Sequence, residues 1–596
     1  MENFNLFQVK LTGGFFAEQQ KLNADVTLHS VYERFAETGR FKALKCKNEE
    51  PHAHIYWDSD VAKWIEAAAY LLSRKEDASI RARYEEAVCD IIANQCENGY
   101  FNSHFQVYEP ENVFTRRHDH ELYCAGHIFE AAVAASEYLH DDRLLAFSEK
   151  YVDYIYERFV VKQDTSFTTP GHEEIEIALL RLYTLTKKEK YKELAAFFLD
   201  MRGKTENAQE KKDAYTQSHL PVREQTTAVG HAVRALYLYT AMADMAQIEK
   251  DETLKNAAEA LFEDIVNHKM YITGGVGADP LKEGFASPFD LPLHNAYCET
   301  CAAIAFAFFC DKLSLLSGDK KYADIFERVL YNGILAGISR SGDKFFYANP
   351  IEVYLPRIQR NAGRPHSFPA KRLQVFNTSC CPPNVCRFFE RLPQYVWYSD
   401  VSNSTLVLSQ FISCALHSEF VDADVVSDFP YSGKVRIKIH SHGQKILFKV
   451  RKPEWSDETF DNEKDGYLVY EQVFDGEELI LDFKPTLKKV YANAQVAEAA
   501  DKVAFTFGPL VLCAEGADNP LPLFSTRIGD IKDAKLTFHA DAPTPFAAYL
   551  PARYRENENG LYAYTKTEKD CTLTLIPYFA WANRGENDMR IWFAEY

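Results

Sequence analysis

Two stretches far apart in the chain contain side chains that together could hold a metal ion and carry out catalysis. The stretches are KEGFASPFDLPLHNAYCETC and NTSCCPPN, and the residues of interest are Glu283, Glu299, Cys301, Cys380 and Cys381. If Glu299 and the cysteines converge, three soft thiolates and one carboxylate form a good ligand set for a tetrahedral zinc ion. Such an ion keeps its thiolates deprotonated near neutral pH. Glu283 would then be a spare carboxylate, free to move protons.

The spacing of these residues also allows simpler interpretations. A Glu-x-Cys and a Cys-Cys pair separated by a long interval do not have the tight CxxC…CxxC spacing that is typical of zinc sites. Cys301 could be a small core residue on a helix, and Cys380-Cys381 could form a structural turn or a vicinal disulfide. The spacing alone leaves these alternatives open.

Length, composition and charge limit the class of protein. The chain has 596 residues, of which 46% are hydrophobic and 14% aromatic, so we expect an ordered protein of two to four domains. Its 67 Lys and Arg against 86 Asp and Glu give a formal charge of -19. This charge argues against a nucleic-acid or anionic-membrane partner. A sugar or another neutral small molecule fits better.

The N-terminal run and the cysteines predict a compartment. The run MENFNLFQVKLTGGFF has no basic and apolar segments of the kind that form a signal peptide. No later run approaches the roughly 18 apolar residues of a membrane span. The 13 scattered cysteines are an odd number, which suits reduced thiols rather than a disulfide framework. We expect a cytoplasmic protein without a membrane partner; a homodimer is compatible with the sequence, which does not fix the oligomeric state.

Most of the chain has helical periodicity. Apolar residues recur at i, i+3, i+4 spacing in about twelve segments, near 16–38, 59–74, 79–97, 119–140, 141–160, 173–187, 190–203, 224–246, 252–270, 297–317, 320–339 and 383–397. Twelve helices in six hairpins predict an (α/α)6 barrel. An open helical-repeat solenoid is the rival, but we find no fixed short period of the solenoid kind.

After about residue 400 the period changes to two. KVRIKIHS, KILFKVR, ELILDFK and KVAFTFGPLVLCAE alternate apolar and polar residues. We therefore predict an (α/α)6 barrel over 1–400, a β-sandwich domain over 401–500 and a second β-sandwich domain over 501–596. The N-terminal run FNLFQVKL is expected to pair with a sandwich strand, tying the first residues to the last domain. Asp465-Gly466 is interpreted as a hairpin turn rather than part of a calcium loop.

Histidines recur at predicted helix starts in the barrel. They lie in HDHELYCAGH, PGHEEIEIAL and VGHAVRAL, and the candidates for contacts with sugar hydroxyls are His120, His172 and His231. One end of a helix ring forms a funnel, and residues at helix N-termini on that rim can face a ligand. The alternative for each is a histidine that satisfies the local backbone. The acidic run 58–60 before another helix is interpreted as an N-cap.

Several motifs together resemble glycoside hydrolase family 127, whose characterised members include β-L-arabinofuranosidases. They are WDSDVAKWIEAAAY, HELYCAGH, GHEEIEIAL, GHAVRALYLYT, AYCETCAA, SCCPPNVCR, GPLVLCAE and IPYFAWANRGENDMRIW, in the same order from about residue 55 to the C-terminus. The resemblance implies a retaining exo-glycosidase with an (α/α)6 catalytic barrel and β-sandwich accessory domains. RFKALKCKNEEPHAHIYW, before residue 55, does not share the pattern. The choice of sugar is therefore open, because such peripheral contacts set it.

The resemblance also implies roles for individual residues. Cys380 matches the nucleophile and Glu283 the general acid/base. The zinc ligands match Glu299, Cys301, Cys380 and Cys381, and the sugar site matches His120, His172 and His231. In this chemistry Cys380 attacks the anomeric carbon while Glu283 protonates the leaving oxygen, and water activated by Glu283 then releases the sugar with retained configuration.

The leading hypothesis is a β-L-arabinofuranosidase that contains bound Zn²⁺ and trims the non-reducing ends of oligosaccharides or other glycosides. A related enzyme acting on another furanoside or on a branched acidic sugar is the alternative within the family. From other classes we keep a non-catalytic, zinc-stabilised carbohydrate-binding protein and an α/α-barrel lyase or epimerase. Glu283 separates the first from the zinc-stabilised binder, because a structural zinc site has no need of an extra carboxylate.

Overall fold

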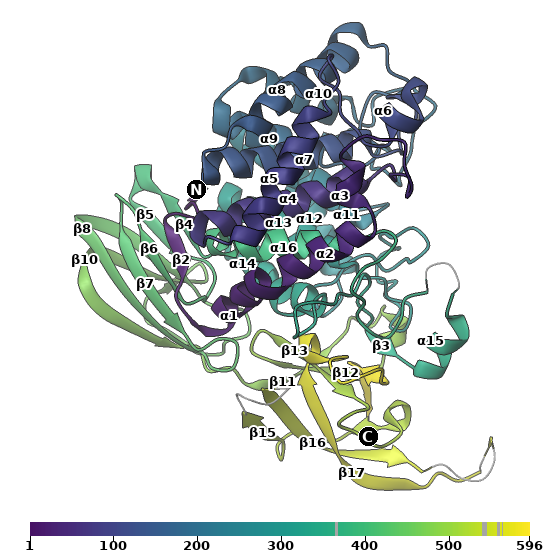
Figure 1. The fold of residues 1–596 in the computed structure, drawn as a ribbon. Coiled ribbons are helices and arrows are strands. Elements are labelled where there is room, and N and C mark those ends of the chain that lie inside the picture. The colour runs from purple at the N-terminus through teal and green to yellow at the C-terminus, as the bar shows by residue number, and fades with distance from the viewer. Residues whose placement is uncertain (364–366, 539–544, 557–560, 563) are drawn as a thin grey trace.

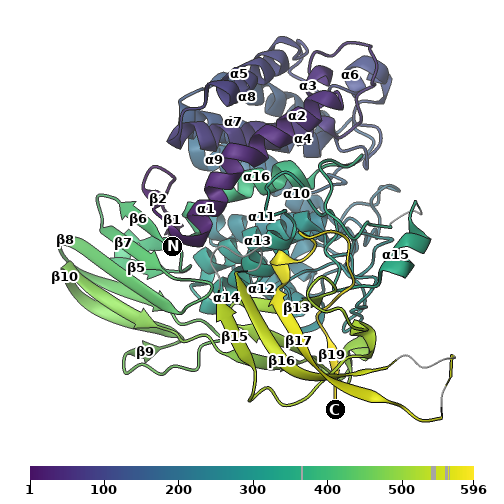
Figure 2. The same ribbon diagram turned by 60° about the horizontal axis from the view of Figure 1, so that its bottom comes forward.

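The computed structural model describes residues 1–363, 367–538, 545–556, 561–562 and 564–596. A helical domain lies at the top of Figure 1, one β-sheet lies at its lower left and a second sheet lies below it. Figure 2 shows the two sheets side by side beneath the helices. The fold therefore has the predicted helical domain followed by β-rich regions.

In the described part of the chain, six helices form a closed inner ring. They are α4 (Trp57–Arg74), α7 (Glu121–Leu139), α9 (Ile175–Thr186), α11 (Ala232–Glu249), α13 (Thr300–Ser317) and α16 (Cys381–Arg391). Each packs on the next in this order, and α16 closes the ring by packing on α4. Nearly all residues of α4, α7, α11 and α13 are buried. Their sequences are rich in alanine, which lets neighbouring helices approach closely.

A second layer of helices covers the ring from outside. Its members are α2 (Leu28–Glu37), α5 (Ala78–Ala93), α8 (Arg143–Tyr156), α10 (Glu189–Met201), α12 (Glu252–His268) and α14 (Lys320–Arg328). Each packs on a helix of the inner ring, and each buries one face. This is the predicted (α/α)6 barrel. Short helices lie outside the two layers: α1 (Gly14–Leu22), α3 (Arg40–Ala43), α6 (Phe105–Tyr108) and α15 (Leu355–Asn361).

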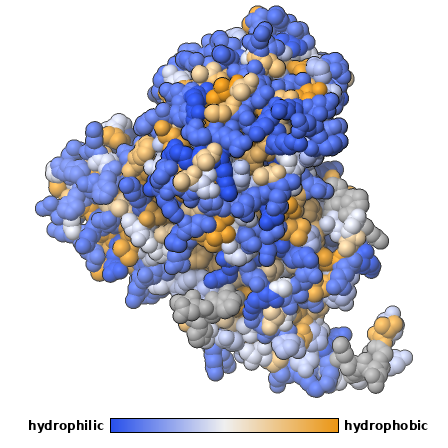
Figure 3. Space-filling model, in the orientation of Figure 1, coloured by the Kyte–Doolittle hydropathy of each residue, from blue (hydrophilic) through white to orange (hydrophobic). Residues whose placement is uncertain are grey.

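The helix α13 is, among the described residues, the one helix long and apolar enough to span a bilayer by length and composition. It lies in the inner ring between α11 and α16, and 83% of its 18 residues are buried inside the protein. Burial in the barrel therefore accounts for its apolar sequence. On the face drawn in Figure 3, hydrophilic residues dominate and apolar residues are scattered in small groups.

The first sheet is built around a long hairpin. Its strands are β1 (Glu2–Asn3), β2 (Val9–Leu11), β4 (Trp397–Asp400), β5 (Thr405–Leu408), β6 (Cys414–His417), β7 (Asp422–Ser427), β8 (Lys434–Arg451), β9 (Glu463–Lys464) and β10 (Tyr467–Asp482). Strands β8 and β10 pair along their length, β7 pairs with the first half of β8, and β5 pairs with its second half. Asp465 and Gly466 both have positive φ between the paired ends Lys464 and Tyr467. The predicted hairpin turn is confirmed.

Among the described residues, all strands of the second sheet except β3 come after residue 486. Its strands are β3 (Glu352–Val353), β11 (Leu487–Tyr491), β12 (Lys502–Phe507), β13 (Leu510–Glu515), β14 (Arg527–Ile528), β15 (Lys535–Phe538), β16 (Phe546–Arg555), β17 (Glu568–Pro577), β18 (Met589–Arg590) and β19 (Phe593–Glu595). The domain boundaries at 400 and 500 stay predictions. Since β11 already belongs to the second sheet, we propose a boundary between β10 and β11.

The N-terminal run pairs with the first sheet. Glu2 pairs with Ser399 and Val9 pairs with Leu416, in antiparallel register. Pairing with a strand of the β-rich region is thus confirmed, whereas the expected link to the last domain is wrong. The reason is the path of the chain, which leaves α16, passes through a short 3-10 helix at Leu392–Tyr395 and enters β4, the partner of β1.

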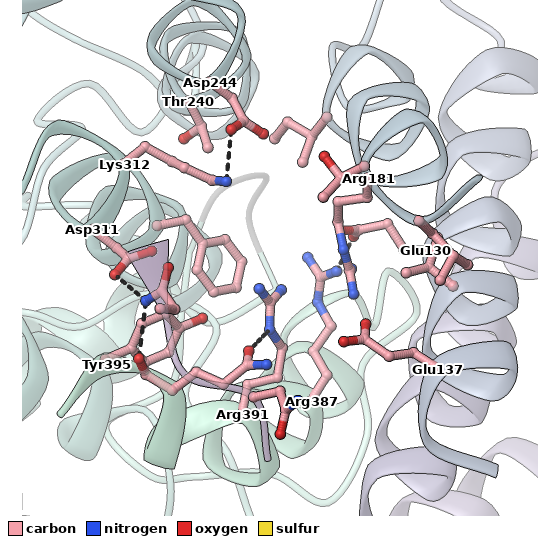
Figure 4. A pocket seen from close by; sticks show the side chains of 18 of the residues that line it. Glu130, Glu137, Arg181, Thr240, Asp244, Asp311, Lys312, Arg387, Arg391 and Tyr395 are labelled. Carbon is pink, nitrogen blue, oxygen red and sulfur yellow. Dashed lines mark hydrogen bonds and ion pairs between the residues drawn. The ribbon is translucent and has the colours of Figure 1, made fainter. Parts of the chain in front are cut away.

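The end of the barrel nearest the N-terminal strands holds a cavity of about 360 Å³, which carries charges of both signs (Figure 4). Arg181 and Arg387 each pair with Glu66 and Glu130. Lys312 binds Asp244 at 2.8 Å. Buried pairs of this kind fix partners across the ring but contribute little net stability. They connect α4, α7, α9 and α16 through the barrel interior.

Candidate active site

A cavity of about 210 Å³ lies at the N-terminal ends of the inner helices. Each helix of the inner ring contributes residues from its first turn or from just before it: Tyr56, Ser59 and Asp60 of α4, His120 and Tyr123 of α7, His172 of α9, His231, Val233 and Arg234 of α11, Glu299 and Cys301 of α13, and Cys380 of α16. Helix N-termini carry partial positive charge, so their convergence favours anionic groups here.

The predicted metal ligands are brought together at this cavity. The Cys301 and Cys381 sulfurs lie 3.4 Å apart, and the Cys380 and Cys381 sulfurs 3.8 Å apart. Glu299 Oε1 lies 3.4 Å from Cys380 Sγ and 3.8 Å from Cys381 Sγ. Zinc–sulfur bonds of about 2.3 Å in a tetrahedron place the sulfurs about 3.8 Å apart, so the donor atoms are close to the spacing that a metal requires. All thirteen cysteines carry free thiols, so a vicinal disulfide is excluded.

The groups of this cluster suppress one another's ionisation. Burial raises the pKa of Cys301, but hydrogen bonds with Cys380 and Cys381 lower it to about 6. The hydrogen bond with Cys301, together with burial, raises the pKa of Cys380 well above its usual value. Burial and the nearby Cys380 raise the pKa of Glu299. One anion suppresses the ionisation of its neighbours, so the four groups ionise together only with a metal ion between them.

The loop before α16 is tied down at several points, which fixes Cys380. Buried Arg40 donates to Asn377 O at 2.8 Å and to Asp60 at 2.9 Å. The Tyr56 and Thr378 hydroxyls lie 2.9 Å apart. Two prolines in the first turn of α16 fix the start of the helix, because proline lacks only an N–H that has no helical partner there. Cys380 is the residue before this turn and points its thiol into the cavity.

Two tyrosines hold the carboxylate and the thiol of the cluster. Tyr297 donates a hydrogen bond to Glu299 Oε2 at 3.2 Å. The Tyr347 hydroxyl lies 3.6 Å from Cys380 Sγ, and Thr300 N donates to Tyr347 O at 2.9 Å. The start of α13 is therefore joined to the segment that carries Tyr347. Glu299 keeps Oε1 for the cysteines because Oε2 is occupied by Tyr297.

Glu283 is positioned by backbone contacts with the start of α11. Ala232 N donates to Glu283 O at 3.0 Å, and Phe285 N donates to Gly230 O at 2.9 Å. A Cβ on Gly284 would lie 2.1 Å from Gly230 O, so only glycine allows this approach. The Glu283 carboxylate lies 3.2 Å from His231 Nε2 and within 4.8 Å of a Glu299 oxygen. The Glu283 carboxylate thus lies beside the cluster.

The three predicted histidines line one wall of the cavity. Ring centroids are 5.6 Å apart for His120 and His172 and 5.7 Å apart for His172 and His231. Burial lowers the pKa of His120 and His172 well below the usual value, and the charge of Arg234 adds to this effect. These imidazoles are therefore neutral at physiological pH. Neutral imidazole offers one donor and one acceptor, which suits hydroxyl groups.

Sequence reasoning did not single out several groups of the site. Tyr123, Tyr215, Arg234 and Tyr347 line the cavity, and Tyr297 binds Glu299. Three of them lie within quoted motifs, HELYCAGH, GHAVRAL and AYCETCAA, but tyrosine and arginine side chains there did not by themselves indicate a role. The N-cap interpretation of residues 58–60 is wrong. No side chain caps α4, Asp58 accepts from Ser103 N at 2.8 Å, and Asp60 binds Arg40 and lines the cavity.

Comparison with known proteins agrees with this geometry. The family model described as β-L-arabinofuranosidase, GH127 catalytic domain, matches residues 8–394. The chain belongs to glycoside hydrolase family 127. The family 127 C-terminal domain model matches residues 487–594, so two domain models of the family match this chain. The protein is accordingly a glycoside hydrolase.

Relatives of this family 127 member match over nearly the whole chain. The non-reducing end β-L-arabinofuranosidase of Bifidobacterium longum subsp. longum is 32% identical, over 91% of this chain and 90% of the relative. A crystal structure of a family 127 β-L-arabinofuranosidase from Geobacillus stearothermophilus T6 has a TM-score of 0.93 at 33% identity, covering 99% of this chain and 100% of that one. A further family 127 β-arabinofuranosidase has a TM-score of 0.90 at 30% identity, covering 100% and 98%.

Proposed function

We propose that this family 127 enzyme removes non-reducing terminal β-L-arabinofuranosyl units with retention of configuration. Cys380 is the nucleophile and Glu283 the general acid/base. The observation that carries the proposal is the placement of Glu283 beside the Glu299–cysteine cluster, on its own loop and paired with His231. The names of the bacterial relatives support the choice of sugar.

The cluster formed by Glu299, Cys301, Cys380 and Cys381 fits zinc among the metals. Three thiolates and one carboxylate suit a borderline-soft ion better than magnesium or calcium. Zinc bound there would keep the thiolates ionised at neutral pH. Because protein ligands would fill all four positions of the ion, its role would be to keep the Cys380 thiol ionised for attack.

The proposed hydrolysis then takes place in two steps, each carried out by residues that line the cavity. In the first step the Cys380 sulfur forms a bond to the anomeric carbon, and the bond from that carbon to the leaving oxygen breaks as Glu283 gives up its proton. In the second step Glu283 takes a proton from water, whose oxygen replaces the sulfur at the same carbon. Two inversions restore the original configuration.

The cavity favours one terminal sugar over an internal segment of a chain. Its volume of about 210 Å³ is below the range of about 300–1,000 Å³ that drug-sized ligands occupy. His120, His172 and His231 border it, and the imidazoles of His120 and His172 are neutral there. We propose that they bind sugar hydroxyls.

Zinc content tests the ligand set. Cys301→Ser is expected to reduce bound zinc and activity together, because a serine hydroxyl is a poorer ligand than a thiolate. Elemental analysis of protein purified without chelator measures the metal, about one ion per chain in the wild type. Cys310→Ser is the control, since Cys310 is buried on the same helix but outside the cluster. Full zinc and full activity in Cys301→Ser would show that the ligand set is wrong.

The histidine wall gives a second expected result. His172→Ala should lower kcat/KM about 10-fold to 100-fold, since loss of a hydrogen bond to a buried hydroxyl costs about 1–3 kcal/mol. Zinc content should not change. Exposed His417, on β6, supplies the control His417→Ala. An unchanged kcat/KM in His172→Ala would remove this residue from the sugar site.

A substrate panel tests the function itself. Aryl furanosides and pyranosides, including acidic sugars, are offered to enzyme of known zinc content, and released monosaccharides are identified. We expect release of L-arabinose from the β-L-arabinofuranoside with retained configuration. Release of another furanose or of an acidic sugar would redirect the assignment within the family, and no release from any member would favour a zinc-stabilised binding protein.

A further inference from the structure

Lys63 on α4 is a fully buried lysine immediately behind the wall of the active-site cavity. Among the described residues its Nζ contacts Ser59 Oγ at 3.4 Å, Asp60 Oδ1 at 3.9 Å and the ring of Tyr123 at 5.0 Å. All three of these residues line the cavity that contains the cysteine cluster. A buried ammonium group with such long contacts is costly unless another negative charge lies close by.

The carboxylates around Lys63 do not cancel its charge. Asp60 is shared with Arg40, which binds it more closely, at 2.9 Å. Glu174 faces His127 at 3.3 Å, and burial together with repulsion from Glu130 raises the pKa of Glu174 well above its usual value. Asp60, Arg40 and Lys63 therefore sum to one positive charge beside the cavity.

The proposed metal centre carries an excess of negative charge. Three thiolates and one carboxylate with a divalent zinc ion sum to a net charge of −2. Ser59, Asp60 and Tyr123, which Lys63 contacts, line the cavity that holds the cluster, so the positive charge of Lys63 lies across the cavity wall from this centre.

We propose that Lys63 is a positioning residue that supplies the counter-charge for the zinc–thiolate centre and so strengthens its hold on the metal. This inference rests on the zinc site of the proposed function. Lys63 does not line the cavity, so it acts through the cluster and not on the sugar. Residues that support metal ligands from behind typically change metal affinity by about 10-fold to 100-fold when they are replaced.

The test compares zinc affinity in neutral and charged variants of the full chain. Zinc alone is the probe, and its dissociation constant is measured at neutral pH by competition with a chromophoric chelator. Lys63→Met and Lys63→Gln are expected to weaken zinc binding about 10-fold to 100-fold. The glutamine variant keeps a donor for Ser59, so it separates loss of charge from loss of that contact. Lys63→Arg restores the charge and is expected to bind zinc nearly as tightly as the wild type.

Lys269 provides a matched control. It is also a buried lysine, bound to Asp264 at 2.7 Å and to Ala228 O at 2.6 Å. Lys269→Met should lower the melting temperature but leave zinc affinity unchanged. Unchanged zinc affinity in both neutral Lys63 variants would overturn the inference. It would also be overturned if Lys63→Arg lost as much zinc affinity as the neutral variants, because the effect would then come from side-chain shape rather than charge. A wild-type protein that binds no zinc would instead refute the proposed function.

Discussion

Replacing Cys380 with serine is expected to lower turnover by about 10⁴-fold or more, the scale seen when a covalent nucleophile is removed. A serine hydroxyl is a much weaker nucleophile than a thiolate at neutral pH and a poorer ligand for zinc. Zinc content should therefore fall in the same protein. Initial rates on an aryl β-L-arabinofuranoside and elemental analysis measure the two effects.

Cys386→Ser is the matched control for this experiment. Cys386 lies on α16 with Cys380 at its start, is fully buried, and is not part of the cluster. It should lose some stability but keep zinc and turnover. If Cys380→Ser hydrolysed the substrate at the wild-type rate, Cys380 would have no covalent role.

Glu283→Gln is expected to keep zinc and fold while turnover of a natural glycoside falls by about 10²-fold to 10⁴-fold, the usual effect of removing a general acid/base. Glutamine keeps the shape of the side chain but exchanges no proton. The loss should shrink for substrates with a good leaving group, provided that hydrolysis of the thioglycosyl intermediate does not become limiting. Paired rates on an activated aryl glycoside and on an unactivated one measure this difference.

The Glu283→Gln result separates an enzyme from an inert zinc protein, because Cys380 belongs to the proposed metal ligands whereas Glu283 does not. Asp290→Asn, an exposed carboxylate on the same loop, controls for general effects on that loop and should be silent. Unimpaired hydrolysis of a natural glycoside by Glu283→Gln would remove this residue from the mechanism, and Asp60 would become the next carboxylate of the cavity to test.

The barrel was predictable because each of its helices buries at least one apolar face, and that face leaves a 3.6-residue period in the sequence. The path of the N-terminus was not predictable in the same way. β1 and β2 contain two and three residues, too few for a period of two to identify a partner. Their pairing with β4 and β6 depends on where α16 ends in space, which only the closed ring determines.

The residues of the candidate site were likewise predictable only in part. Glu299, Cys301, Cys380 and Cys381 stood out because a Glu-x-Cys and a Cys-Cys pair bring metal-binding side chains together in sequence. The spacing left structural interpretations open, and the resemblance to family 127 supplied the roles. Tyr297 and Tyr347 did not stand out, since tyrosine is common in buried cores and in this chain, which has 34 of them. Their role depends on where the start of α13 meets the segment that carries Tyr347, at the backbone hydrogen bond between Thr300 and Tyr347.

Closure of the ring by α16 also sets an order of events during synthesis. Cys301 and Cys381 are 80 residues apart in sequence, an interval that takes about 4–16 s to translate at 5–20 residues per second. Until then Glu299 and Cys301 have no partner cysteines, and β1 and β2 have no strands to pair with. Binding of the proposed zinc ion is consequently a late step in the synthesis of this protein, and a nascent chain halted before Cys380 would have an incomplete set of proposed ligands and an open barrel.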